Sequence, residues 1–254
     1  MLLVIDIGNT STKFGVYDGS RLLSKFAIPT QRNGYADDIG AAIKSNIEIP
    51  IDAAVSSSVV PEAEILINEI LRNGFGIEPV SIDHNFKVGL KILYDPPDAV
   101  GADRLVAAAS AAEKYGAPCV VCDFGTATTI DAVNSAAEYL GGAISPGMNT
   151  MADALHLKAS KLPRVEIAKP DKVIGNSTIG SIRSGIFFGY IGLVEGMVSR
   201  MAIELGGDPR VVATGGFSGL ISSATNIIDV VDEDLIIDGL ASLYLKHSAG
   251  RNKP

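Results

Sequence analysis

An apolar run that ends in Asp-x-Gly occurs twice in this chain. Val4-Ile5-Asp6-Ile7-Gly8 and Val121-Cys122-Asp123-Phe124-Gly125 share their Val, Asp and Gly at a constant offset of 117 residues (123 against 6), and the same offset places Thr12 over Thr129. A buried strand that leads into a glycine turn brings its last acidic side chain to the edge of a sheet, because glycine allows the backbone to turn tightly there. The repeat therefore predicts a duplicated α/β fold with a cleft between the halves.

The length and the order of the expected elements also favour two halves. The 254 residues exceed the size of a typical single core, and we place the halves at residues 1–116 and 117–254. The first thirty residues are expected to form three strands, with Asp18-Gly19 at the centre of a type I′ hairpin turn. Asp95-Pro96-Pro97-Asp98 is expected to be a non-helical loop. The other expected elements are helices at 38–47, 61–73, 102–115, 148–157, 177–205 and 234–246, and strands at 53–60, 119–121 and 211–213.

Composition and charge disfavour several classes of protein. The chain has 21 Lys and Arg against 29 Asp and Glu, and its net charge of −8 argues against a nucleic-acid partner held through phosphates. No basic leader precedes the first strand, and the apolar stretch from Gly185 to Val198 is broken by glycines and Glu195, so we expect neither secretion nor a membrane span. Cys119 and Cys122 have Cys-x-x-Cys spacing but lie in an apolar run, where we expect them to be buried. A reducing cytoplasm fits this pattern.

Three glycine turns at strand ends carry groups that can hold a nucleotide. Segment 6–13 offers amides, hydroxyls, a carboxylate and a lysine, segment 123–129 offers a carboxylate and threonines, and Thr214-Gly215-Gly216 follows a third apolar strand. Backbone amides in such turns bind phosphate oxygens, and a carboxylate binds a cation. The first turn taken alone is equally explained as an ordinary hairpin with Asp and Asn as turn formers. Together the turns predict one nucleotide clamped from several sides, without a P-loop sequence.

These turns resemble the phosphate and adenosine elements of the actin-like ATPase superfamily, which includes sugar kinases and actin. With further motifs they resemble the type III pantothenate kinase family over nearly the whole chain, in order and in spacing. The resemblance implies two ribonuclease-H-like domains with a central cleft, and ATP-dependent phosphorylation of pantothenate to 4′-phosphopantothenate, the first step toward coenzyme A. The motifs are Asp6-x-Gly8-Asn9-Thr10, Gly101-Ala102-Asp103-Arg104, Asp123-x-Gly125-Thr126-Ala127, Gly141-Gly142-x-Ile144-x-Pro146-Gly147 and Leu162-Pro163.

The resemblance also implies roles for individual residues. Asp103 is implied as the general base toward the primary hydroxyl of pantothenate. Asp123 is implied as the ligand of a monovalent cation, K⁺ or ammonium, and Asp6 is a candidate ligand of Mg²⁺. ATP is implied to contact Asp6, Ile7, Gly8, Asn9, Thr10, Ser11, Thr12, Lys13 and Thr126, and pantothenate to contact Tyr94, Gly101, Ala102, Asp103, Arg104 and Thr178.

Other interpretations of the same residues stay open. An acid in a first helical turn beside a surface arginine is routine, Tyr94 also fits a core aromatic, and Thr178 also fits a helix N-cap. A kinase for another small alcohol, such as a sugar, and a catalytically silent regulatory relative are the alternative functions. The resemblance further implies a homodimer, in which the partner subunit helps to close the pantothenate site near Thr178. The apolar stretch 179–201 is the expected interface, because it exceeds what one thin domain can cover.

Overall fold

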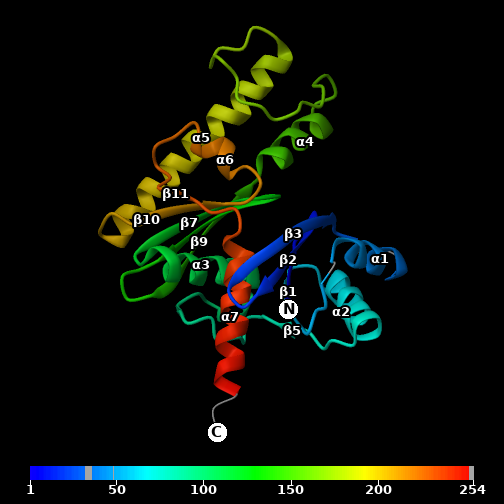
Figure 1. The fold of residues 1–254 in the computed structure, drawn as a ribbon. Helices are drawn as coiled ribbons and strands as arrows, with labels where there is room; N and C mark the ends of the chain where they lie inside the picture. The colour runs from blue at the N-terminus through cyan, green and yellow to red at the C-terminus, as the bar shows by residue number, and fades with distance from the viewer. Residues whose placement is uncertain (32–35, 48, 252–254) are drawn as a thin grey trace. The chain divides into compact units, whose positions relative to one another are not determined.

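The computed structural model describes residues 1–31, 36–47 and 49–251 (Figure 1). Contacts between residues divide the chain into two compact units. The first comprises residues 1–110 and the C-terminal segment that begins at Asp234, and the second comprises residues 111–233. The halves 1–116 and 117–254 stay a prediction about domains. The compact units differ from them because the C-terminal helix packs on the sheet of the first unit.

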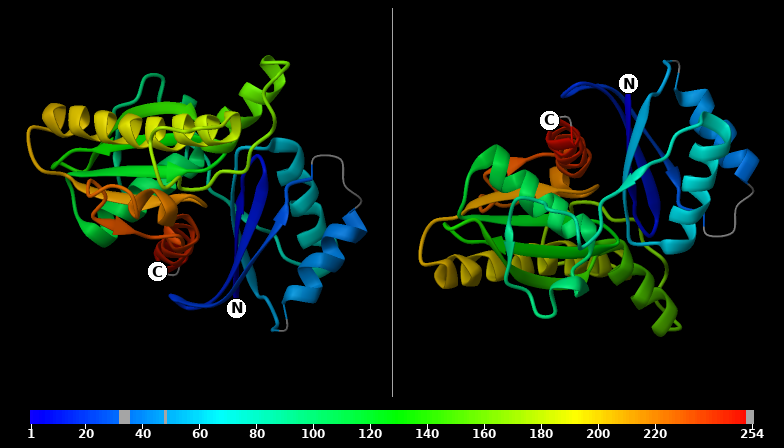
Figure 2. Two further views of the ribbon diagram at one scale, coloured as in Figure 1. Left: turned by 90° about the horizontal axis from the view of Figure 1, so that it is seen from above. Right: turned by 90° about the horizontal axis from the view of Figure 1, so that it is seen from below.

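The first unit is built on a five-stranded mixed sheet with the strand order β3-β2-β1-β4-β5. Strand β1 pairs antiparallel with β2 and parallel with β4. Helices α1 and α2 cover one face of this sheet and α7 covers the other (Figure 2). The elements are β1 (Leu2–Ile7), β2 (Ser11–Asp18), β3 (Arg21–Pro29), α1 (Ala36–Asn46), β4 (Ala53–Ser58), α2 (Pro61–Phe75), β5 (Val80–Ser81), β6 (Lys91–Ile92), η1 (Pro97–Ala99), the first part of α3 (Ala102–Tyr115), and α7 (Leu235–Arg251).

The two faces of this sheet have different partners, because side chains alternate along each strand. Leu3 and Ile5 point into the core formed with α1 and α2, where both are fully buried. The opposite face carries Asp6 and meets α7, where the Tyr17 hydroxyl donates to the Asp238 carboxylate at 2.6 Å. Cover on both faces explains why β1 is a continuous apolar run rather than an alternating one.

Two local predictions for the first unit are wrong in detail. The hairpin between β2 and β3 is present, but its central residues are Gly19 and Ser20, and only Gly19 has a positive φ, at 58°. That pattern is typical of a type II′ turn, which needs glycine only at its first central position. The segment expected to be non-helical runs into one 3₁₀ turn at Pro97–Ala99, because proline is compatible with the first turn of a helix.

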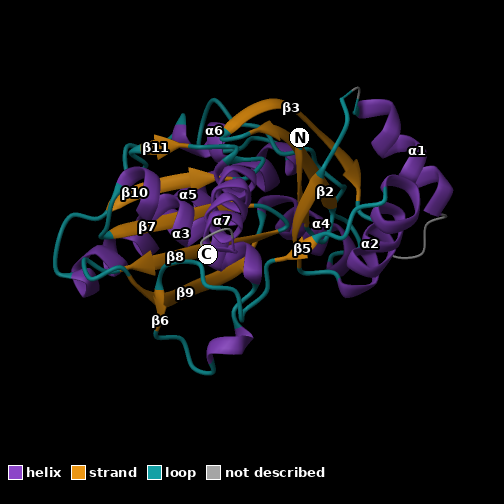
Figure 3. Cartoon of the chain, turned by 60° about the horizontal axis from the view of Figure 1, so that its bottom comes forward, coloured by secondary structure: helices purple, strands orange, loops and turns teal. Residues whose placement is uncertain are grey.

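The second unit repeats this topology. Its strands lie in the order β11-β10-β7-β8-β9 (Figure 3), and β7 pairs antiparallel with β8 and parallel with β10. Read from the other edge, this order corresponds strand for strand to that of the first unit, so the duplication is confirmed. Helices α4, α5 and α6 contribute to the core on one face. The elements are β7 (Cys119–Phe124), β8 (Ala127–Val133), β9 (Glu138–Pro146), α4 (Met148–Lys158), α5 (Thr178–Leu205), β10 (Arg210–Thr214), α6 (Ser218–Ser222) and β11 (Val230–Val231).

Helix α5 is one continuous helix of 28 residues. Its length and composition alone would let it cross a membrane, but its buried side chains form much of the core beneath the second sheet, as in a core helix of a globular protein. Gly185, Gly189, Gly192 and Gly196 recur at helical spacing along it, and a methyl group at the first three would meet no atom within 4 Å. One side of α5 is therefore buried and another side is open.

The sequence-based expectation agrees best with the helices. The helix at 102–115 is confirmed as α3, and the helix at 148–157 is confirmed as α4 with one further residue. Strands β8 and β9 lie outside the expectation, because glycines interrupt the alternating pattern of β9. The missed strands are the second and third strands of the repeated unit, which the duplication could have predicted.

Candidate active site

The first Asp-x-Gly turn joins β1 to β2. Asp6 is 8% exposed and lies opposite Lys13 in the antiparallel register and opposite Ser57 in the parallel one. Paired residues of neighbouring strands point to the same face, so these three polar side chains form a row across the sheet. The Gly8 amide closes the turn by donating to the Ser11 carbonyl at 3.1 Å. The row brings a carboxylate, an ammonium and a hydroxyl to the edge where β1 ends.

The predicted ATP-binding residues of this turn are not equally accessible. The side chains of Ile7 and Thr12 are buried, and the Thr12 hydroxyl lies 3.0 Å from the Thr30 hydroxyl. Asn9 and Thr10 are exposed at the tip. A ligand can therefore meet Asn9 and Thr10 through side chains, whereas contacts with Ile7 and Thr12 are restricted to the backbone.

The predicted substrate helix, α3, begins beside the same sheet edge. The Val59 amide, directly after β4, donates to the Ile7 carbonyl at 3.1 Å. A methyl group at Gly101 would lie 3.7 Å from the Val59 side chain and 2.5 Å from the Asp103 carboxylate. Asp103 Oδ1 in turn accepts from the Arg104 amide at 2.8 Å. This chain of contacts links the end of β1 to Asp103 within the first unit, and Val59 is the link that sequence reasoning missed.

Arg104 is buried rather than at the surface. Its side chain is 7% exposed, and its guanidinium carbon lies 5.8 Å from the centre of the half-buried Tyr94 ring. An arginine over an aromatic face gains cation–π attraction, and its planar fork matches a carboxylate or a phosphate. The interpretation of Arg104 as a surface residue is therefore wrong, and the two predicted substrate residues lie together.

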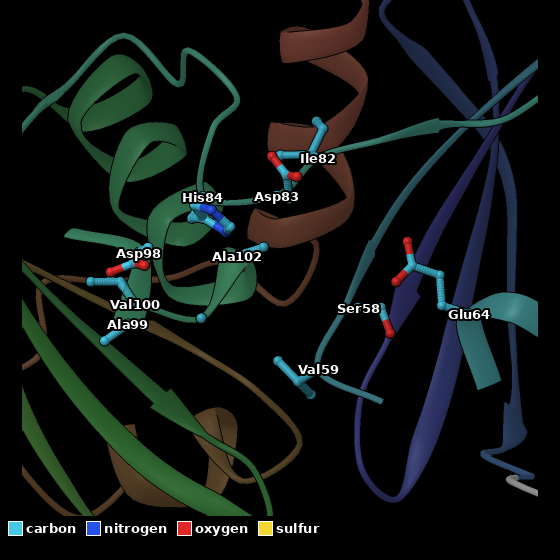
Figure 4. A pocket seen from close by; sticks show the side chains of 11 residues that line it. Ser58, Val59, Glu64, Ile82, Asp83, His84, Asp98, Ala99, Val100 and Ala102 are labelled. Atoms are coloured by element: carbon cyan, nitrogen blue, oxygen red, sulfur yellow. The ribbon is translucent and has the colours of Figure 1, made fainter. Parts of the chain in front are cut away.

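A pocket of about 270 Å³ lies between the end of β4 and the start of α3 (Figure 4). Figure 4 shows Val59 and Ala102 on opposite sides of it, and the carboxylates of Glu64, Asp83 and Asp98 also line it. Three carboxylates in one pocket repel an anion, so this pocket is not suited to the carboxylate of pantothenate. Of the predicted substrate residues, the lining includes Gly101 and Ala102 but not Tyr94, Asp103 or Arg104.

The second Asp-x-Gly turn joins β7 to β8. Asp123 lies opposite Thr129 in the antiparallel register and opposite Thr214 in the parallel one. Gly215 has a φ of 86°, and a methyl group there would overlap the Asp123 carboxylate and come within 2.7 Å of the Phe124 backbone. The third glycine turn therefore packs directly against the second one, and glycine at 215 is what permits this approach.

The tip of the second turn is held by the start of α4. The carbonyl of Thr126 accepts from the Gly147 amide at 3.0 Å and from the Thr150 hydroxyl at 2.6 Å. A methyl group at Gly147 would overlap the Gly125 carbonyl. The Gly-rich motif that ends at Gly147 thus supports the turn that carries Thr126, a role that its sequence alone does not reveal.

The first residue of α5 is Thr178, which is exposed. The N-cap is Ser177, whose hydroxyl accepts from the Gly180 amide at 3.1 Å. The interpretation of Thr178 as the N-cap is therefore wrong, and its hydroxyl does not serve that cap.

The cysteines are buried, as predicted. Both Cys119 and Cys122 are free thiols in β7, and burial raises the pKa of each to about 12. The thiolate is the reactive form of cysteine, so the two side chains behave as small apolar residues at neutral pH. Tyr190 belongs to the same core cluster as Cys122, and its hydroxyl is hydrogen-bonded to Thr128. Burial first, and then the nearby Cys122 and Asp123, raise the pKa of Tyr190.

The registers of the two hairpins differ by one residue. In the strand pairing Thr12 corresponds to Thr128, and Lys13 corresponds to Thr129. The match of Thr12 with Thr129 at a constant offset is therefore wrong beyond the turn, because the second loop is one residue shorter. As a result, a lysine faces the first aspartate and a threonine faces the second.

Known structures share the fold. A Campylobacter jejuni protein assigned to the Baf family of transcriptional activators has a TM-score of 0.64 at 20% identity, over 97% of this chain and 99% of its own. A Sinorhizobium meliloti protein assigned as a 2-dehydro-3-deoxygalactonokinase has a TM-score of 0.61 at 11% identity, again over 97% and 99%. At these identities the likeness shows the fold alone. It is the predicted duplicated ribonuclease-H-like fold of the actin-like ATPases and sugar kinases.

Sequence comparison identifies the family. The type III pantothenate kinase of Geobacillus sp. (strain WCH70) is 42% identical over 253 residues, which cover 97% of this chain and 98% of that protein. The profile of the type III pantothenate kinase family matches residues 2–200. The chain therefore belongs to the type III pantothenate kinase family.

Proposed function

We propose that this protein transfers the γ-phosphoryl group of ATP to the primary hydroxyl of pantothenate, giving 4′-phosphopantothenate in the first step of coenzyme A synthesis. Its membership of the type III pantothenate kinase family supports this reaction. The structural observation that carries the proposal is the contact chain Ile7–Val59–Gly101, which joins the first glycine turn to the helix start that bears Asp103. A phosphate-binding turn beside a positioned carboxylate is what phosphoryl transfer to an alcohol requires.

Asp103 serves as the general base in this proposal. Its carboxylate is only partly exposed and is oriented by the Arg104 amide at the start of α3. Kinases need a proton acceptor and precise positioning more than covalent chemistry, and a carboxylate near the substrate hydroxyl supplies the acceptor. In this proposal the buried Arg104, whose guanidinium lies over the Tyr94 ring, pairs with the pantothenate carboxylate or the transferred phosphate.

The first turn is the proposed site for the phosphates of Mg–ATP. No group of three or more His, Cys, Asp or Glu side chains in the described part of the chain fits a metal ion. Magnesium can bind through a single protein carboxylate when phosphate oxygens and water complete its coordination shell. Asp6 alone therefore fits as the protein ligand of magnesium. The bound ion would offset phosphate charge, and Lys13 opposite Asp6 adds a fixed positive charge of the protein.

The second turn is the proposed site of a monovalent cation. Asp123 faces the neutral hydroxyl of Thr129, whereas Asp6 faces Lys13. A carboxylate and a hydroxyl both offer oxygen ligands, which suit K⁺ or ammonium next to a polyphosphate. Thr126, at the tip of the same turn, is the proposed further contact with ATP.

We also propose a homodimer formed through the open side of α5. The glycine spacing leaves room for close approach of a second helix, and Ile179 and Ile203 are 46% and 79% exposed. Thr178, at the exposed start of α5, is the proposed contribution of one subunit to the pantothenate site of the other. Sedimentation of the purified protein tests the dimer. A monomer at micromolar concentration would reject it.

The proposed location is the cytoplasm, where ATP is available. The main alternative is a kinase of the same fold that acts on another small alcohol, because a fold does not determine the substrate. A silent regulatory relative is the second alternative. It is less well supported, because Asp6, Asp103, Arg104, Asp123 and Thr126 are all present together.

A coupled assay of ADP release tests the proposed reaction. Purified protein is given Mg–ATP with pantothenate or with common sugars, each with and without K⁺. We expect turnover with pantothenate, and stronger turnover when K⁺ is present. Turnover of a sugar but not of pantothenate would reject the substrate, and no turnover with any acceptor would favour the regulatory alternative.

The variant Asp103→Asn tests the proposed base. We expect turnover to fall by about 10²-fold or more, because the general base is lost while the side chain keeps its size. Asp98→Asn, an exposed acid of the neighbouring pocket, is the matched control and should retain normal turnover. Near-normal turnover of Asp103→Asn would remove Asp103 from this role.

A further inference from the structure

Strand β4 ends in three consecutive serines with unequal surroundings. The Ser56 hydroxyl lies 3.4 Å from the Ser81 hydroxyl, and the Ser58 hydroxyl donates to the Val60 carbonyl at 3.1 Å. The Ser57 side chain is 1% exposed, and its hydroxyl has no hydrogen-bond partner among the described residues. A buried hydroxyl without a partner is costly, and such groups are rare in native proteins. Of the three serines, Ser57 is therefore the one whose buried hydroxyl has no structural explanation.

The position of Ser57 relates it to Asp6. The two residues are direct neighbours in the parallel register of β1 and β4, so their side chains point to the same face of the sheet. Adjacent strands lie about 4.8 Å apart, which lets a change of side-chain rotamer bring the hydroxyl to the carboxylate. Ser56, one residue earlier, points to the opposite face, where its partner Ser81 donates to Glu64 at 2.7 Å.

Asp6 is flanked on both sides by groups that can donate a hydrogen bond. Lys13 lies opposite it on β2, and Ser57 lies opposite it on β4. Asp6 is only 8% exposed, so a carboxylate oxygen that faces away from the ion meets mainly protein groups. A carboxylate that binds a metal through one oxygen needs a donor for the other, and the protein has to supply that donor here.

We propose that Ser57 is a positioning residue for Asp6: its hydroxyl donates to one oxygen of the Asp6 carboxylate while the other oxygen binds the Mg²⁺ of Mg–ATP. This inference rests on the proposed metal role of Asp6. It explains why an unpartnered hydroxyl lies beside that carboxylate, because the partner becomes available when Asp6 turns to the ion. Ser57 itself needs no access to solvent for this role.

Binding of Mn²⁺ in place of Mg²⁺ tests the inference. Mn²⁺ is titrated into the full-length protein with a non-hydrolysable ATP analogue, and free Mn²⁺ is followed by electron paramagnetic resonance. Removal of an outer hydrogen bond to a metal ligand typically weakens metal binding by about 10–100-fold, and we expect Ser57→Ala to fall in this range. The KM for pantothenate should not change.

Thermal unfolding of the same variants without metal or nucleotide separates positioning from a structural role. Ser57→Ala should unfold at the wild-type temperature or above it, because it removes a buried hydroxyl that has no partner. Ser56→Ala, the matched control on the opposite face, should bind Mn²⁺ normally. Ser57→Thr keeps the hydroxyl and should restore most of the Mn²⁺ affinity.

The outcomes distinguish this inference from the proposal on which it depends. If Asp6→Asn weakens Mn²⁺ binding and Ser57→Ala does not, Ser57 has no positioning role and the metal role of Asp6 stands. If Asp6→Asn itself leaves Mn²⁺ binding unchanged, the metal role of Asp6 and this inference both fail. If Ser57→Ala lowers the unfolding temperature and the Mn²⁺ affinity together and Ser57→Thr restores neither, Ser57 is structural and the inference is overturned.

Discussion

The two Asp-bearing turns share a strand topology, but only the first has a lysine opposite its aspartate. Each follows the central strand of a sheet with the same strand order, and each aspartate has an antiparallel and a parallel neighbour. In the first turn the antiparallel neighbour is Lys13, and in the second it is Thr129. The parallel neighbours, Ser57 and Thr214, both carry hydroxyls.

The comparison teaches how one duplicated scaffold places different side chains beside equivalent aspartates. A lysine supplies a fixed positive charge toward a polyphosphate, whereas a threonine supplies only an oxygen. Under the proposed function, a cation at Asp123 would supply a positive charge at the second turn, where the first turn has Lys13. The one-residue difference in loop length produces this contrast, because it decides which side chain faces the aspartate.

The largest effect is expected at the glycine that packs against the second aspartate. Gly215→Ala combines a positive φ with overlap of the Phe124 backbone, and we expect it to cost about 3 kcal/mol or more of unfolding free energy. At Gly8 of the first turn a methyl group would lie 3.0 Å from one carbonyl oxygen, so Gly8→Ala should cost about 1 kcal/mol or less.

Chemical denaturation of both variants measures this difference. Gly216→Ala is the control for the second turn, since a methyl group there meets no atom within 4 Å. Equal stability of the Gly215→Ala and Gly216→Ala variants would contradict the packing described for the second turn.

A smaller effect is expected when Lys13, which lies opposite Asp6, is replaced by threonine, the residue type that lies opposite Asp123. Lys13→Thr should lower kcat/KM for ATP by about 10–100-fold, the scale of one lost hydrogen bond between charged groups. Initial rates at varied ATP concentration measure it. Lys25→Thr, which removes an exposed lysine bound to Asp234 in the same unit, should leave these rates unchanged. If both variants behave alike, Lys13 is only a surface charge.

The reverse exchange should reduce the dependence on a monovalent ion. Thr129→Lys places an ammonium opposite Asp123, where the account puts K⁺, so the ratio of rates with and without K⁺ should fall toward one. Rates in KCl compared with tetramethylammonium chloride at equal ionic strength measure this ratio. Thr128→Val, on the other face of β8, removes a hydroxyl elsewhere and should keep the wild-type ratio. A Thr129→Lys enzyme that still needs K⁺ would place the ion elsewhere.

The smallest effect is expected at the buried cysteines of β7. Cys122 occupies the place that Ile5 has in the first repeat, and its pKa of about 12 leaves roughly one thiol in ten thousand ionised at pH 8. Iodoacetamide at pH 8 should therefore leave both cysteines of the native protein unmodified, and should label both after denaturation. Mass spectrometry counts the labels. Rapid labelling of the native protein would show that β7 is less well packed than β1.

Much of this arrangement can be predicted from local sequence. The Asp-x-Gly repeat predicts the duplication, since a strand, a carboxylate and a glycine turn are encoded within five residues. Helix α3 is predicted to the residue, because its alanine-rich run begins after Gly101 and ends before Gly116.

Features that depend on pairing between distant segments could not be predicted. The exchange of Lys13 for Thr129 follows from strand register, which a constant offset in sequence does not show. Arg104 lies over the ring of Tyr94, ten residues earlier, and the row at Asp6 includes Ser57, more than fifty residues later. The packing of the C-terminal helix on the first sheet likewise arises from tertiary contacts, which hydrophobic periodicity does not specify.

The proposed function assigns a different cation to each of the two aspartate turns. Crystals grown with a non-hydrolysable ATP analogue, Mn²⁺ and Tl⁺ in place of K⁺ test it directly, because anomalous scattering locates each ion separately. We expect Mn²⁺ at Asp6 and Tl⁺ at Asp123. Tl⁺ at Asp6, or Mn²⁺ at Asp123, would contradict this assignment.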